Sequence, residues 1–170
     1  MRIIFLDYDG VVNTLWFQEV DGEPDFNFPN MIQVNNTQAI AWLNKLYREY
    51  EYSIVVSSTW RYFDNYKEAL YSAGLNKDIK IIDTTQKGSF DEKRGDEIQQ
   101  WLDKNSQYEI EDFVILDDDS DMKHLTSHLI KTDSIIGFTF YEYSKICDRW
   151  GGRNKWYLKK LKQKLKKKNI

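Results

Sequence analysis

The feature that most constrains the fold is the N-terminal run Ile3-Ile4-Phe5-Leu6, which stops at Asp7-Tyr8-Asp9-Gly10. A short apolar run closed by turn residues predicts a buried strand. Strands of a parallel sheet are covered on both faces, and ligands bind beyond their carboxyl ends. The sequence therefore predicts that Asp7 and Asp9 lie at a sheet edge where chemistry usually occurs.

The two carboxylates are two residues apart, so in an extended segment they point to the same side and repel each other. Two unit charges about 4 Å apart interact by roughly 4 kcal/mol at an effective dielectric of about 20. A bound cation would remove much of that cost, although a plain strand followed by an Asp-Gly turn is the simpler interpretation. A calcium loop counted from Asp7 does not fit, because Val12 and Gln18 stand where it needs glycine and glutamate.

Three later stretches add to this signal. A β-branched run, 53–56, ends in the hydroxyls and basic side chain of Ser57-Ser58-Thr59-Trp60-Arg61. Another strand-like run, 113–116, ends in Asp117-Asp118-Asp119-Ser120-Asp121. Between them, Lys93-Arg94-Gly95 opens a helical pattern. The presence of these stretches favours an enzymatic interpretation of Asp7 and Asp9 over a plain strand and turn.

Taken in order, the four stretches resemble the four motifs of the haloacid dehalogenase-like (HAD) superfamily of phosphohydrolases, over roughly residues 1–140. Their residues are most similar to those of the small HAD domain of bacterial and phage RNA-repair proteins. The resemblance implies a three-layer, Rossmann-like α/β fold whose mainly parallel sheet of about five strands has the order 5-4-1-2-3. That order would bring the strand ends carrying Asp7, Ser57 and Asp117 side by side.

The rest of the chain alternates predicted strands with predicted helices, which favours a parallel sheet flanked by helices. We expect a catalytic domain over 1–140 and a basic helical extension over 141–170 that packs on the same domain. The expected strands are 2–7, 53–57, 79–83, 112–117 and an edge strand at 129–136, and the expected helices are 37–50, 62–73, 93–104, 121–128 and most of the tail from 141.

The resemblance implies a role for each motif. Asp7 would be the nucleophile that forms an aspartyl-phosphate, and Asp9 the general acid and then the general base. Ser57 would donate a hydrogen bond to a phosphoryl oxygen. The basic residue would be Arg94, which is followed by glycine as in the common pattern, and its neighbour Lys93 is the second choice. Relatives more often carry lysine here, and the residue would stabilise the phosphoryl group near a helix N-terminus.

The expected cofactor is Mg²⁺, which prefers hard oxygen ligands and often bridges protein to phosphate. By resemblance, its ligands would be the Asp7 side chain, the Asp9 backbone carbonyl and an acid of the stretch 117–121. Asp118 is favoured over Asp117, which falls where many relatives carry a small residue. Asp121 would support the metal or its waters.

Other residues near the motifs carry alternatives. We expect Gly10, Ser58 and Arg61 to bind substrate, but Ser58 also suits a helix N-cap and Arg61 an exposed helix position. Trp60 is more typical of a core residue than of a stacking surface. Lys87, before Gly88, is a third candidate for the basic position.

Substrate size is suggested by the short gaps between motifs, which leave room for no large cap. A capless or minimally capped site suits the end of a macromolecule, and the aromatic segment 14–35 would offer a flap for a base. Residues 149–170 carry ten basic and no acidic side chains, so the remaining 148 residues carry 14 basic and 27 acidic ones. The basic segment favours a nucleic-acid partner, with a solvated helix docked through its apolar side as the alternative.

The composition points to one cytoplasmic domain. The single cysteine, Cys147, cannot form an intramolecular disulfide, and the N-terminal apolar run is too short for a signal peptide. His124 and His128 lie one helical turn apart, but without a third ligand they are interpreted as structural.

Together these features predict a Mg²⁺-dependent phosphomonoesterase acting on a nucleotide or a nucleic-acid terminal phosphate. The alternatives are a small-metabolite phosphatase and a non-catalytic module that binds phosphate or nucleic-acid ends.

Overall fold

The computed structural model describes residues 1–14, 34–86 and 93–151. The predicted aromatic flap, Lys87 and all of the basic tail beyond residue 151 lie outside them. The described elements are β1 (Arg2–Leu6), α2 (Thr37–Tyr50), β2 (Ser53–Val56), the 3₁₀ helix η1 (Thr59–Tyr62), α3 (Tyr66–Ser72), β3 (Lys80–Thr84), α4 (Arg94–Lys104), η2 (Ser106–Tyr108), β4 (Asp112–Asp117), η3 (Lys123–His128), β5 (Leu129–Lys131) and a helix over residues 140–151.

The strands form one parallel sheet in the order β3-β2-β1-β4-β5, which is the predicted order read in reverse. β1 is central, and its last residue, Leu6, pairs with Val56 of β2 and Leu116 of β4. The Asp7 amide donates to the Leu116 carbonyl over 2.9 Å and the Ser57 amide to the Leu6 carbonyl over 3.0 Å. This register brings the carboxyl ends of the three strands level with one another.

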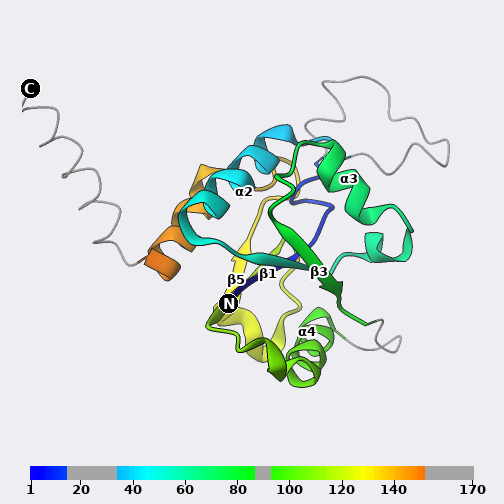
Figure 1. Cartoon of the computed structure of the whole chain (residues 1–170), viewed down its shortest axis with the longest axis vertical. Helices are drawn as coiled ribbons and strands as arrows, with labels where there is room; N and C mark the ends of the chain where they lie inside the picture. Colours follow the sequence, from blue (N-terminus) through cyan, green and yellow to red (C-terminus); the bar gives the residue numbers. More distant parts are fainter. Residues whose placement is uncertain (15–33, 87–92, 152–170) are drawn as a thin grey trace, which may run out of the picture.

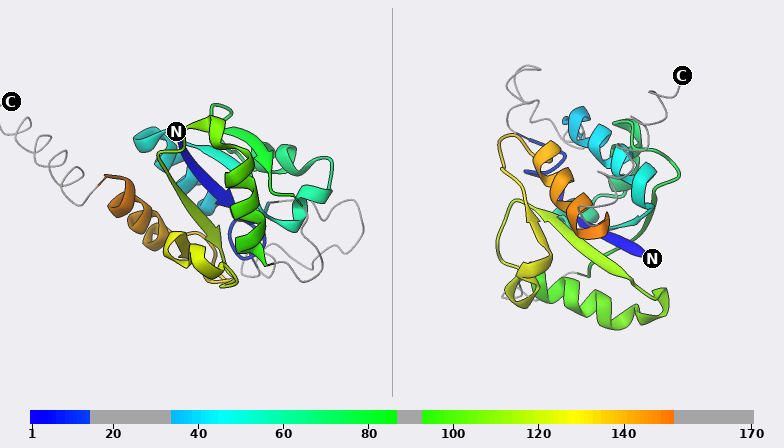
Figure 2. Two further views of the ribbon diagram at one scale, coloured as in Figure 1. Left: turned by 90° about the horizontal axis from the view of Figure 1, so that it is seen from below. Right: turned by 90° about the vertical axis from the view of Figure 1, so that its left-hand side faces the viewer.

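Helices cover both faces of the sheet, which gives the expected three layers (Figure 1). Ile4 and Leu6 pack on one side with α2, while Ile3 and Phe5 pack on the other with α4. Strand residues alternate between faces, so the apolar residues 3–6 of β1 serve both cores. The two further views show α4 on the opposite side of the sheet from α2 and the 140–151 helix (Figure 2).

α2 has the predicted bounds for identifiable reasons. Asn36 accepts a hydrogen bond from the Ala39 amide over 2.9 Å, and such a cap is worth about 1 kcal/mol. Its buried positions, Ile40, Leu43 and Leu46, recur at the spacing of one helix face. α2 thus covers the sheet face behind β1 and β2.

Three expected elements are corrected. The edge strand ends at Lys131 rather than 136, because the Asp133 carboxylate accepts from the Ile135 and Ile136 amides and turns the chain. The helix expected over 121–128 is the shorter 3₁₀ helix η3, which begins at Lys123 after the acidic turn. The region 62–73 is divided between η1 and α3, since Phe63 is extended.

The helix over residues 140–151 belongs to the core. Tyr143, Ile146 and Trp150 are buried in the same cluster as α2. Arg149, the first cation of the basic segment, donates two hydrogen bonds to the Asp112 carboxylate over 2.7 and 2.8 Å. Among the described residues, no helix has the length and apolar character needed to cross a membrane.

Candidate active site

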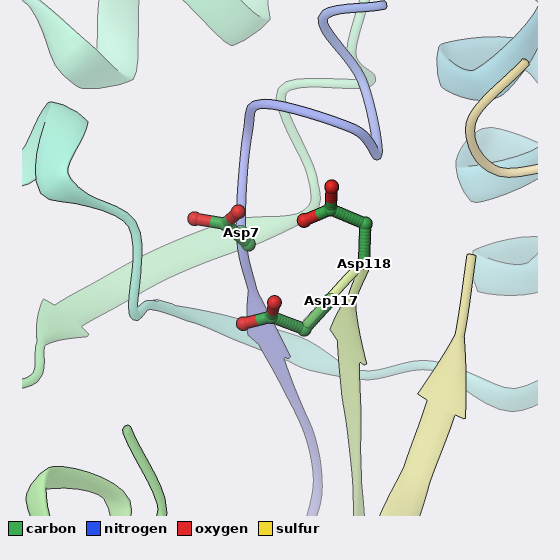
Figure 3. Close-up of side chains that lie close together, drawn as sticks. All are labelled: Asp7, Asp117 and Asp118. Atoms are coloured by element: carbon green, nitrogen blue, oxygen red, sulfur yellow. The ribbon is translucent and has the colours of Figure 1, made fainter. Parts of the chain in front are cut away.

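Three carboxylates meet where β1 and β4 end (Figure 3). Asp7 follows β1, Asp117 is the last residue of β4, and Asp118 comes next along the chain. One carboxylate oxygen of each lies within 4.8 Å of the others. Asp7 and Asp117 are buried and Asp118 is half-buried. The parallel register thus gathers residues that are 110 positions apart in the sequence.

Arg94 extends from the first turn of α4 into this group. Its Nη1 lies 3.3 Å from Asp7 Oδ1 and 3.7 Å from Asp117 Oδ2, and it also donates to the Ser57 carbonyl. Burial disfavours the guanidinium charge, but the carboxylates of Asp7 and Asp117 outweigh that effect and raise the pKa of Arg94. Lys93, the other predicted candidate, is exposed just before the helix.

The start of α4 is fixed by close packing. A Cβ on Gly95 would lie 2.3 Å from the Met122 carbonyl oxygen, so only glycine allows this approach. The Asp121 carboxylate accepts from the Arg94 amide over 3.2 Å and caps the helix. Asp121 is not one of the three clustered carboxylates, and it holds the start of the helix that carries Arg94. Its predicted support of the metal or its waters stays a prediction.

The electrostatics of the carboxylate group show an excess of negative charge. Burial, followed by the negative charge of Asp7, raises the pKa of Asp117 to about 7. Burial also raises the pKa of Asp7, although the Arg94 guanidinium and the Ser58 hydroxyl act in the opposite direction. Burial and nearby acids raise the pKa of Asp118 as well. One guanidinium does not compensate three carboxylates.

The group fits a hard divalent cation. All three side chains offer carboxylate oxygens, which suit Mg²⁺. Asp117 Oδ2 is buried and has no hydrogen-bond partner among the described residues, so one ligand atom is left for another group. Both acids that the sequence left open, Asp117 and Asp118, are in this group. The predicted part of the Asp9 carbonyl stays a prediction.

The turn after β2 supplies hydroxyls. Ser57 Oγ is fully buried and has no partner within the described part of the chain. The Ser58 hydroxyl donates to Asp7 and accepts from the Trp60 amide, so it caps η1 and contacts the site at once. Both interpretations of Ser58, cap and site residue, thus describe the same side chain.

Asp9 has quite different surroundings from Asp7. Its side chain is exposed, yet both carboxylate oxygens accept hydrogen bonds: Oδ1 from Asn13 Nδ2 over 2.8 Å and Oδ2 from Trp60 Nε1 over 2.9 Å. The negative charge of Asp9 helps to raise the pKa values of Asp7 and Asp118, so its carboxylate lies near theirs. The sequence indicated neither donor, although Asn13, four residues after Asp9 in a Gly-containing turn, carried a local signal.

Gly10 serves the backbone of the loop. Its φ is +69°, which favours glycine, and a Cβ would lie 2.3 Å from the Asp118 carboxyl group. Its carbonyl accepts from Thr132 Oγ1 over 2.7 Å. Gly10 therefore lets the loop after β1 approach the acidic stretch at the end of β4.

Arg61 is engaged away from the carboxylates. Its guanidinium contacts both oxygens of Glu97 on α4, over 3.0 and 3.1 Å, and donates to the carbonyls of Ser57 and Ser58. The ion pair is largely buried. Arg61 thus ties the hydroxyl turn to α4, and its predicted contact with substrate stays a prediction.

Comparison with known proteins gives one match. The model of a family described as the HAD domain in Swiss Army Knife RNA repair proteins matches residues 3–142 of this 170-residue chain. The matched range contains every residue of the site described above. No curated protein and no solved structure matches the chain.

Proposed function

Because the chain belongs to the family of HAD domains in Swiss Army Knife RNA repair proteins, we propose that it is a Mg²⁺-dependent phosphomonoesterase for nucleic-acid terminal phosphates. The observation that carries the proposal is the meeting of a buried carboxylate, a guanidinium and two hydroxyls beside a second, exposed carboxylate. These are a nucleophile, donors for phosphoryl oxygens and a proton carrier.

The nucleophile in this proposal is Asp7. One carboxylate oxygen attacks phosphorus as the ester P–O bond breaks, which leaves an aspartyl-phosphate. Arg94, 3.3 Å away, favours the ionised form of Asp7 and donates toward phosphoryl oxygens. The unpartnered Ser57 hydroxyl would supply a further donor. An ionised carboxylate needs no base to activate it.

The proton carrier is Asp9. In the first step its carboxyl group gives a proton to the departing alkoxide, and in the second it takes one from the water that attacks phosphorus. Inorganic phosphate leaves and Asp7 is restored. The exposed position of Asp9 supports this role, because the leaving group and the attacking water must both reach its carboxyl group from solvent.

Asp7, Asp117 and Asp118 are the residues proposed to hold Mg²⁺. When bound, the ion would neutralise charge on the phosphoryl oxygens. Two observations support this assignment: Asp117 Oδ2 accepts no hydrogen bond from the described residues, and burial together with neighbouring acids raises the pKa values of all three carboxyl groups.

A nucleic-acid end is the substrate class that we favour. The family occurs in RNA repair proteins, and the sequence leaves room for no large cap between its motifs. The ten basic residues of 149–170 would add attraction to a polyanion. Hydrolysis of a phosphorylated oligonucleotide should then decline with added salt more steeply than hydrolysis of an aryl phosphate.

A phosphate-release screen tests the proposal. The full chain is incubated with Mg²⁺ and with RNA oligonucleotides carrying a 3′- or 5′-phosphate, mononucleotides or sugar phosphates. We expect release from oligonucleotide ends that is lost with EDTA and in Asp7→Asn, and retained in Asp119→Asn, an exposed acid outside the carboxylate group. Preference for sugar phosphates would contradict the substrate class. Tight binding of phosphorylated RNA without any release would indicate a non-catalytic module.

A further inference from the structure

The loop that carries Asp9 is closed on itself. The Tyr8 carbonyl accepts from the amides of Val11, Val12 and Asn13 over 3.2, 2.9 and 2.8 Å, and the Gly10 amide donates to the Asn13 carbonyl over 2.7 Å. These bonds fix the backbone of Asn13 relative to that of Asp9. The Asn13 side-chain amide therefore donates to Asp9 Oδ1 from a fixed backbone position.

Trp60 is held just as firmly from the other side. Its ring is 7% exposed, stacks on Tyr8 with centroids 5.1 Å apart, and meets the edge of Phe63 at 6.4 Å. Tyr8 is itself buried, and its hydroxyl donates to the Tyr66 carbonyl over 2.6 Å. The packing leaves the indole N–H directed at Asp9 Oδ2. Trp60 is thus a core residue and a hydrogen-bond donor together.

We propose that Trp60 and Asn13 are positioning residues that hold the exposed Asp9 carboxyl group in the geometry needed for proton transfer to the leaving group. This inference rests on the proposed function and extends it to two residues to which the sequence analysis gave no catalytic or binding role. An exposed aspartate otherwise samples several rotamers, and loss of alignment in a proton-transfer step costs on the order of a hundredfold in rate.

Ser58 and Trp60, which lie in one short turn, act on different carboxylates. Ser58 donates to Asp7, and Trp60, two residues later, donates to Asp9. The turn after β2 therefore orients the nucleophile and the proton carrier relative to each other. Neither Trp60 nor Asn13 needs to touch substrate for this effect.

Leaving-group dependence tests the proposal. A general acid matters for an alkyl phosphate, whose alkoxide is a poor leaving group, and matters little for a nitrophenyl phosphate. In kcat/KM, which reports on the first chemical step, we expect Trp60→Phe and Asn13→Ala to lose about tenfold to a hundredfold on the alkyl ester. On the aryl ester they should lose no more than about threefold. Equal losses on both esters would mean a merely structural role.

Trp101→Phe is the matched control. The Trp101 indole donates to Asp83 Oδ2 over 2.6 Å, and its ring is also buried, but the pair lies away from the carboxylate group. This variant should leave the ratio of the two kcat/KM values unchanged. Asn13 is half-buried at the surface, so Asn13→Ala answers the question even if Trp60→Phe does not fold.

A spectroscopic measurement separates this proposal from the phosphatase assignment. In ¹H–¹⁵N spectra of the full chain, Asp9→Ala should shift the indole resonance of Trp60 and leave that of Trp101 in place. An unmoved Trp60 resonance would overturn the positioning proposal whatever the activity. A shifted resonance in a protein that hydrolyses neither ester would instead refute the proposed function and, with it, the catalytic purpose of the contact.

Discussion

The two sides of the catalytic edge are built differently. On one side, Asp7, Asp117 and Asp118 follow directly from β1 and β4, so the strand register alone brings them together. On the other side, the donors Ser58, Trp60 and Arg94 come from a turn and from a helix start, and each depends on tertiary packing. The comparison teaches that the acceptors follow from topology and the donors follow from packing.

The two sides also differ in charge. The acceptor side holds three carboxylates whose pKa values are all raised, with burial as the first cause. The donor side answers with one guanidinium and several neutral groups. The remaining charge is the strongest reason to expect a cation at the acceptor side. Substitutions on the two sides should therefore have different effects on activity and on the pH dependence of stability.

The largest effect is expected from Asp7→Asn. Removal of the nucleophile should lower kcat by at least about 10³-fold, as for other groups that form covalent intermediates. The carboxamide has the same shape, so circular dichroism and thermal unfolding should show a folded protein. Activity near that of the native chain would contradict the assignment of Asp7.

Arg94→Ala should have the next largest effect. Loss of the donor that contacts Asp7 and Asp117 should lower kcat/KM by about 10²–10³-fold. Arg94→Lys should recover only part of this, because a lysine is a point charge and not a planar fork. Lys93→Ala, at the exposed neighbouring position, should stay within about twofold. A larger loss in Lys93→Ala than in Arg94→Ala would reverse the choice between the two.

The acceptor side should show a pH-dependent stability. With no divalent cation added, the folded protein holds a proton on Asp117 up to about pH 7, while the unfolded chain releases it near the ordinary aspartate pKa of 3.8. Stability contributed by this proton is therefore present below about pH 4 and is lost as pH rises to 7. Asp117→Asn should remove roughly 2–4 kcal/mol of this pH dependence.

Urea unfolding at pH 5 and pH 8 measures that difference. Added Mg²⁺ should stabilise the native chain more at pH 8 than at pH 5, because ionised carboxylates bind it better. A stability that rises between pH 5 and pH 8 equally in the native chain and in Asp117→Asn would contradict the charge imbalance. So would the absence of any effect of Mg²⁺ at pH 8.

The smallest effect concerns the packing that holds the donor side. Gly95→Ala inserts a Cβ against the Met122 backbone and should cost about 1–3 kcal/mol in unfolding free energy. Gly74→Ala provides a comparison, because an alanine would be strained at its φ of +98° but would have open space around its Cβ. Only Gly95→Ala should also lower kcat/KM. Equal effects of the two variants on activity would contradict the inference that the packing of Gly95 positions Arg94.

The sequence predicted the acceptor side well because each acid ends a short apolar run. The strand order and the helix over 37–50 followed from the same patterns and from the family resemblance. The sequence favoured Arg94 over Lys93 through the glycine that follows it, but the contact of Gly95 with Met122, which places the start of α4, is contained in no local pattern. Trp60 was expected to be a core residue. It is one, but the second role of its N–H depends on where Asp9 lies in space.

Packing also assigned some polar residues to structure. Arg61 pairs with Glu97 and Asp121 caps α4, and the sequence indicated neither contact; their predicted roles toward substrate and metal stay predictions. Similarly, Asp133 ends β5 by accepting amides of a turn, although apolar Ile135 and Ile136 favoured a longer strand. Long-range partners of this kind are not visible in a single sequence.

Trapping of the phosphoenzyme tests the central claim most directly. In Asp9→Asn, an aryl phosphate needs no general acid for its first step, while the base for the second step is missing. We predict release of one equivalent of aryl alcohol and, after an acid quench, one phosphoryl group on the peptide that contains Asp7. A phosphoryl group on another residue, or turnover of the native chain with full activity in Asp7→Asn, would contradict the account.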